Sequence, residues 1–154
     1  MHLNYETLLL ETDSTDLIIK EKPLRYNDGR IKGKKVAIRK DIKTIKEKGC
    51  VLAEELGHYY TSSGDILDQS SSSNRKQEYR ARLWAYNKMV GLSGIISSHK
   101  AGCHSIYEMA DHLDVTEGFL AEALSCYRSK YGVYTIFDNY IIYFEPSIGV
   151  LELI

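Results

Sequence analysis

The sequence predicts a single-domain α+β protein, and three observations support this class. Two stretches, residues 43–62 and 75–90, carry apolar side chains at the spacing of helices that pack against a core. Residues 35–39 alternate polar and apolar side chains, which is typical of a half-buried strand. Residues 133–144 are β-branched and aromatic on both sides of a short polar turn, which predicts a hairpin. Strands and helices that occur in separate runs favour an α+β architecture.

Composition limits the classes of partner and compartment. The 154 residues include 44% hydrophobic side chains, enough for one packed core. Twenty basic residues stand against 21 acidic ones, so we expect no direct nucleic-acid partner and no membrane-surface binding. No apolar run is long enough to span a membrane, and the first residues do not resemble a secretion signal. Three scattered cysteines suit a reducing compartment, so a cytoplasmic location is expected.

The N-terminal part is expected to form a small antiparallel sheet before the first long helix. Residues 5–11 predict a short helix, whereas residues 16–22 could form either a helix or a strand. Asp28-Gly29 is a strong hairpin signal, so residues on either side of it are expected to pair as strands. Asp41 is the expected cap of the helix over 43–62.

The C-terminal part is expected to contain a helix pair and the hairpin. Asn74, with Gln77 three residues later, predicts the start of the helix over 75–90. Residues 91–100 carry no clear pattern. Residues 104–113 and 116–131 predict two helices, the second capped by Thr116, and residues 149–154 predict a last strand. This pair scans like a DNA-binding helix-turn-helix, but its second helix begins with acids, so it is interpreted as a packing or protein-docking element.

A group of acids and one histidine carries the functional hypothesis. Glu54 and His58 are four residues apart on the first long helix, so they share a face, with Glu55 beside them. Glu78 lies on an apolar stripe of the next helix, where an acid is costly unless it is paired or binds a cation. Carboxylate and imidazole are zinc ligands, and Glu55 could take a proton from an activated water. Asp65 offers a further oxygen.

Structural interpretations of the same residues remain open at this stage. Glu54, Glu55 and His58 could form an ordinary solvated helix face, and Glu78 could pair with a nearby arginine of its own helix. Asp65 could simply belong to the turn that ends the first long helix.

Two motifs resemble those of a known peptidase family. Residues 51–59, VLAEELGHY, resemble the zinc helix of the ImmA/IrrE family of metallopeptidases, and residues 78–85, EYRARLWA, resemble that family's second motif. The resemblance implies a zincin-like fold over residues 1–154, with the metal motif in a core over 1–90 and the helix pair and hairpin in 91–154. It also implies Zn²⁺ as cofactor and, as target, a helix-turn-helix repressor of a phage or mobile element.

Carried over to this chain, the resemblance gives a role to four residues, one of which differs from the residue that the family usually has. His58 and Glu78 would be metal ligands, Glu55 would be the catalytic base, and Glu54 would occupy the first ligand position, where the family usually has histidine. A second carboxylate neutralises the ion, so it should activate water less. We therefore expect weaker peptidase activity, a different divalent cation, or no metal. The alternative function is a non-catalytic antirepressor that binds the repressor without cleavage, and the remaining one is a helical domain whose acids are coincidental.

Overall fold

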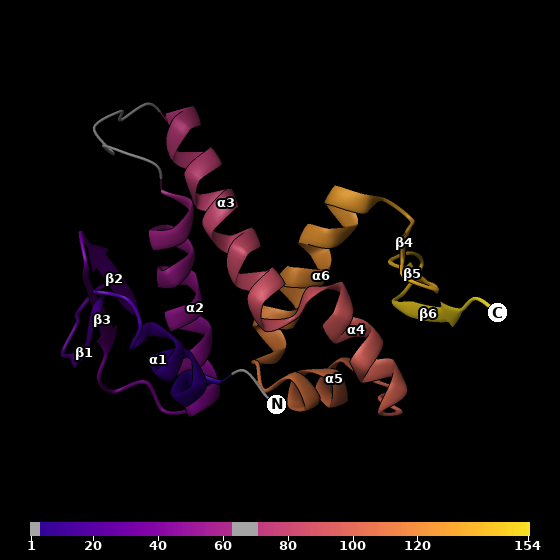
Figure 1. The fold of residues 1–154 in the computed structure, drawn as a ribbon, viewed down its shortest axis with the longest axis horizontal. Helices are drawn as coiled ribbons and strands as arrows, with labels where there is room; N and C mark the ends of the chain where they lie inside the picture. The colour runs from indigo at the N-terminus through magenta and orange to yellow at the C-terminus, as the bar shows by residue number, and fades with distance from the viewer. Residues whose placement is uncertain (1–3, 63–70) are drawn as a thin grey trace.

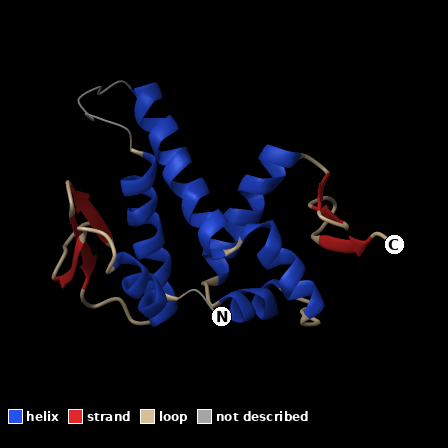
Figure 2. Ribbon diagram, in the orientation of Figure 1, coloured by secondary structure: helices blue, strands red, loops and turns tan. Residues whose placement is uncertain are grey.

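A computed structural model describes residues 4–62 and 71–154, and within these ranges the chain forms six helices and two three-stranded sheets. Figure 1 shows the first sheet at one end, the helices in the middle and the second sheet at the opposite end. Figure 2 shows the same separation of strands from helices. The α+β class predicted from the sequence is confirmed.

The first sheet is mixed, and its central strand is the last of the three in the sequence. β3 lies between β1, which runs parallel to it, and β2, which runs antiparallel to it. The prediction of an antiparallel sheet is therefore wrong for the β1 pair. The tight turn between β2 and β3 contains Gly33 at φ +60°, a conformation that glycine adopts readily, whereas the predicted turn residue Gly29 belongs to β2. The three strands are β1 (Ile18–Lys22), β2 (Gly29–Lys32) and β3 (Lys35–Arg39).

Of three helices in this half of the chain, α2 packs against the sheet and the other two pack against α2, and two begin at residues other than those predicted. The three are α1 (Tyr5–Thr12), α2 (Ile45–Thr61) and α3 (Ser71–Met89). Thr44 rather than Asp41 caps α2, because its hydroxyl accepts a hydrogen bond from the Glu47 N–H at 3.1 Å. Helix α3 begins before Asn74, so the predicted cap lies inside the helix.

The remaining helices form a second helical unit against α3. They are α4 (Gly91–Lys100), α5 (Ile106–Leu113) and α6 (Glu117–Tyr131). Thr116 caps α6 as predicted, accepting from the Phe119 N–H at 3.1 Å. No side chain caps α4 at its preceding residue; the Tyr127 hydroxyl instead accepts a hydrogen bond from the Gly91 N–H at 3.1 Å and donates one to the Asn87 side chain at 3.0 Å.

The second sheet is an antiparallel meander that closes the far end of the chain. The predicted hairpin and the predicted last strand are both confirmed. Ile142, which is completely buried, and Tyr140 belong to the side that packs on the helices, whereas Tyr134, Ile136 and Leu151 are more than half exposed. The strands are β4 (Tyr134–Phe137), β5 (Tyr140–Tyr143) and β6 (Gly149–Glu152).

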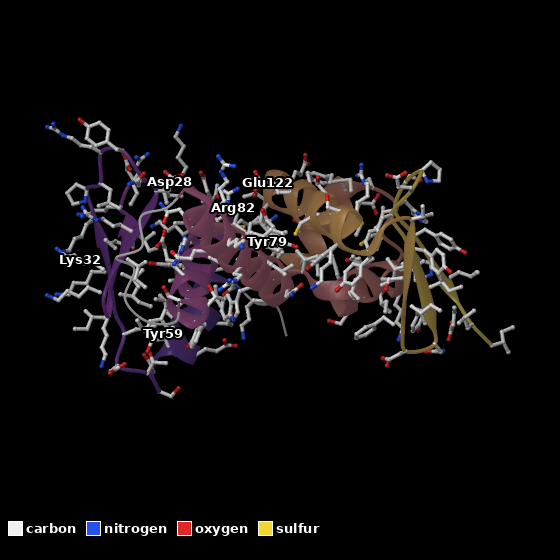
Figure 3. The ribbon with its side chains drawn as sticks, turned by 90° about the horizontal axis from the view of Figure 1, so that it is seen from above. Asp28, Lys32, Tyr59, Tyr79, Arg82 and Glu122 are labelled. Atoms are coloured by element: carbon white, nitrogen blue, oxygen red, sulfur yellow. The ribbon has the colours of Figure 1, made fainter. Side chains whose placement is uncertain are left out.

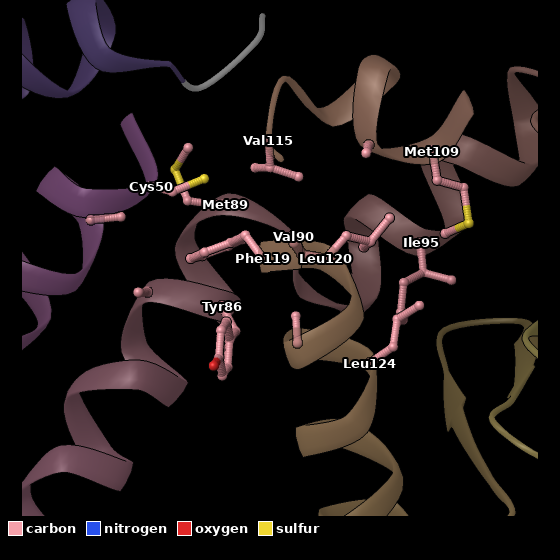
Figure 4. Close-up of a cluster of buried hydrophobic side chains, with 14 of the residues drawn as sticks. Cys50, Tyr86, Met89, Val90, Ile95, Met109, Val115, Phe119, Leu120 and Leu124 are labelled. Atoms are coloured by element: carbon pink, nitrogen blue, oxygen red, sulfur yellow. The ribbon is translucent and has the colours of Figure 1, made fainter. Parts of the chain in front are cut away.

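A continuous apolar core joins the two halves. Its largest fully buried side chains include Leu8 of α1, Leu52 and Leu56 of α2, and Leu120 of α6. Figure 4 shows the central part of this core, which includes Cys50 of α2 and Met89 at the end of α3. Burial of side chains of this size stabilises the fold by about 1.5–3 kcal/mol each. Within the described ranges, no helix has both the length and the apolar character needed to cross a membrane.

Candidate functional site

The crossing of α2 and α3 determines where the motif residues lie. At Gly57, a Cβ atom would lie only 2.2 Å from the carbonyl oxygen of Ala81, so no residue with a side chain fits without a shift of the backbone. Ala81 itself is completely buried. Two small residues therefore let the helices approach closely at this point. The neighbouring residue His58 is consequently brought within reach of α3.

His58 and Glu78 meet across this crossing. The Nε2 atom of His58 lies 3.4 Å from Oε1 of Glu78, and Nε of Arg82 lies 3.8 Å from the other oxygen, Oε2. The Glu78 side chain is 53% exposed, so it does not face the core as its apolar stripe predicted. The structure thus brings two of the predicted metal ligands together, and it also forms the arginine pair that the sequence left open.

Glu55 is covered by the edge of the first sheet. A Cβ atom on Gly29 of β2 would lie 2.7 Å from Cγ1 of Val51 and 2.9 Å from both Cγ and Oε1 of Glu55, so a side chain at this position would push these residues aside. Burial, followed by the negative charges of Glu54 and Glu78, raises the pKa of Glu55 from 4.5 to about 7. At neutral pH this carboxyl group therefore exchanges a proton readily, as a general base must.

Glu54 has different surroundings from Glu55. Burial raises the pKa of Glu54, the positive charge of Arg82 opposes that rise, and the negative charge of Glu122 adds to it. Figure 3 shows Arg82 of α3 and Glu122 of α6 on the same side of the molecule. Glu54 is not among the described residues that line the cleft between β2, α2 and α3. The predicted first ligand is therefore not on the cleft wall that carries the other motif residues.

A cleft of about 690 Å³ lies between β2, α2 and α3. Three motif residues line it, Glu55, His58 and Glu78, together with Tyr59. The other lining residues are polar or belong to the strand edge, namely Gly29, Arg30, Ile31, Gly33, Thr61, Ser62, Asn74 and Gln77. The contribution of β2 was missed from the sequence, where Gly29 was interpreted as a turn residue.

The described residues fit only part of a catalytic zinc site. Such a site uses three protein ligands and leaves one position for water. His58 offers a ring nitrogen and Glu78 a carboxylate at the same place, but in residues 4–62 and 71–154 no three His, Cys, Asp or Glu side chains gather closely enough to hold a metal ion. Asp65, the further oxygen considered from the sequence, lies outside the described residues.

Comparisons with known proteins identify no family. No family model matches the chain, and no curated protein or solved structure matches it. The residues of the cleft, and the resemblance of residues 51–59 and 78–85 to the two family motifs, therefore carry the functional hypothesis.

Proposed function

We propose that this chain is a metal-dependent endopeptidase of zincin-like fold that cleaves a helix-turn-helix repressor protein. The observation that carries the proposal is that Glu55, His58 and Glu78, from two different helices, line one cleft beside a strand edge. The repressor as target, the zincin-like fold and Zn²⁺ as cofactor are supported by the resemblance of residues 51–59 and 78–85 to the two family motifs.

Each of the three cleft residues would have its own role in peptide hydrolysis. A divalent cation held there would supply Lewis-acid chemistry. His58 would hold it through Nε2 and Glu78 through a carboxylate oxygen, because these two atoms lie 3.4 Å apart in the cleft. Glu55 would accept the proton of the attacking water and pass it to the leaving amine, a role suited to its pKa of about 7. The target peptide would lie in the cleft along β2.

A non-catalytic antirepressor is the second candidate function, and Arg82 favours it. The guanidinium group lies 3.8 Å from Glu78 and acts on the pKa of Glu54. A fixed positive charge at this position competes with a metal ion for both carboxylates. The exposed apolar side chains of the second sheet, which include Ile136 and Leu151, further favour a protein-binding role.

One incubation separates the two candidates. The purified chain would be mixed with the helix-turn-helix repressor encoded nearest to its own gene, with Zn²⁺ or with EDTA, and the products would be identified by mass spectrometry. Peptidase activity predicts zinc-dependent fragments that disappear with Glu55→Gln. A stable complex by gel filtration, without fragments, would support the antirepressor instead. Absence of both fragments and complex would refute both candidates.

A further inference from the structure

The outer face of the first sheet concentrates positive charge. In each strand, alternate residues point away from the helices, and on this face five of those residues are exposed lysine or arginine. Figure 3 shows one of them, Lys32, projecting from the sheet on the side away from the helices. The five are Lys20, Lys22, Arg30, Lys32 and Lys35, and they are called here the basic face.

These five cations have no acidic partner within the described residues. The acids nearest to them in the sequence are already occupied: Asp16 pairs with Lys34, Glu21 with Lys48, and Asp28 with Arg39. The uncompensated charges on one small face repel one another, and an anion bound across them would relieve that repulsion. The net charge of −1 for the whole chain hides this separation of charge.

The pairing register places the five cations around a shallow hollow. Lys20 of β1 and Arg30 of β2 lie on either side of Ala37, and Lys32 lies beside Lys35. The small side chain of Ala37 leaves a hollow of about 310 Å³, whose other apolar lining residues are Ile18 and Val36. The face is about 13 Å long and 10 Å wide, from the usual rise and spacing of strands.

The number of positive charges on the basic face can be compared with the number of negative charges that each class of partner offers over the same length. Duplex DNA carries about one negative charge per 1.7 Å of helix axis when both strands are counted, so a length of about 13 Å holds roughly eight phosphates, of which about half face one side. An extended acidic peptide turns only every second side chain to one side, so it offers about two or three carboxylates over the same length. The roughly four phosphates on one side of the duplex therefore come closer to the five cations than the carboxylates of the peptide do.

The side chains of the face also limit how DNA would be recognised. Among the residues that the structure describes, none that lines the hollow is aromatic, so they offer no platform on which the bases of a single strand could stack. None of the described lining residues is asparagine or glutamine, the side chains that read adenine edges. The major groove admits a two-stranded ribbon, so a three-stranded sheet is too broad for its lysines and arginine to reach guanine edges. Phosphate contacts fix position and carry no sequence information. We propose that the outer face of the first sheet binds the phosphate backbone of duplex DNA without sequence preference.

The test measures binding of the full-length chain to a fluorescein-labelled 24-base-pair duplex by fluorescence anisotropy, at salt concentrations from 50 to 200 mM. We expect the logarithm of the binding constant to fall with the logarithm of the salt concentration, with a slope of about −4 for four or five phosphate contacts. The double variant Lys20→Glu/Lys32→Glu should bind at least about tenfold more weakly and show a slope smaller by about 2.

The matched control reverses two exposed charges elsewhere, in Lys76→Glu/Arg80→Glu on α3, and should bind DNA like the wild type. Absence of binding at 50 mM salt, or an equal loss in both double variants, would overturn the proposal. Tighter binding of a labelled decaglutamate peptide than of the duplex would also overturn it, in favour of an acidic protein partner. Both double variants keep every residue that lines the cleft, so this test is independent of the peptidase test.

Discussion

Replacing Glu55 with glutamine should stabilise the folded protein at pH 8 more than at pH 5. The folded-state pKa of Glu55 is raised from 4.5 to about 7, chiefly by burial. Below pH 4.5 the carboxyl group is protonated in both the folded and the unfolded chain, so it costs nothing. Above pH 7 it is ionised in both, and the folded state bears the cost of a buried negative charge. Glutamine has nearly the same shape and never bears that cost.

The expected size follows from the shift in pKa. One unit corresponds to about 1.36 kcal/mol, so the rise from 4.5 to about 7 gives an upper limit of about 3 kcal/mol. Glu55 is partly open to the cleft, and solvent screening reduces the effect. We therefore expect the gain in unfolding free energy on Glu55→Gln to be about 1–2 kcal/mol larger at pH 8 than at pH 5.

Urea unfolding at pH 5, 6, 7 and 8, in EDTA, measures this difference directly. Glu6→Gln is the matched control, because Glu6 is an exposed acid of α1 with little desolvation to relieve. A gain from Glu55→Gln that is the same at pH 5 and pH 8, or a loss of stability at pH 8, would refute the argument that Glu55 is held in an unfavourable environment.

Three further predictions concern the helices and the metal. Gly57→Ala should destabilise the protein by about 2 kcal/mol or more through overpacking, seen as a lower Tm, whereas Gly118→Ala, with open space around its Cβ position, should gain up to about 1 kcal/mol; similar changes in both would contradict the close crossing. Tyr127→Phe should cost about 1–3 kcal/mol in urea unfolding because the buried Gly91 N–H loses its acceptor, and a neutral result would count against that bond. Glu54 does not line the cleft, so Glu54→His should leave the Zn²⁺ affinity in calorimetric titration unchanged, and a clear gain would place position 54 in the ligand set.

The sequence predicted the elements better than their arrangement. The periodicity of α2 and the Thr116 cap are local signals, and both agreed with the structure. The parallel pairing of β1 with β3 is a long-range choice that no local pattern encodes. Gly29 shows the difficulty directly: Asp-Gly is a turn signal, yet here the glycine is needed because β2 passes against Glu55.

The candidate site was predictable in part for the same reason. The helical spacing places Glu55 and His58 near each other, but their meeting with Glu78 depends on the contact between Gly57 and Ala81, two small residues 24 positions apart. Charge was the least predictable property. A near-zero net charge argued against a nucleic-acid partner, whereas the fold gathers basic residues of three strands on one face.

A Zn²⁺ titration followed by NMR of the histidine ring nitrogens would show whether His58 and Glu78 bind a cation together in the cleft. We expect zinc to shift the His58 ring resonances at stoichiometric metal and Glu78→Gln to weaken this binding at least about tenfold, because a carboxylate ligand is lost. Resonances of His58 that do not change while zinc binds, or an unchanged affinity in Glu78→Gln, would contradict this expectation.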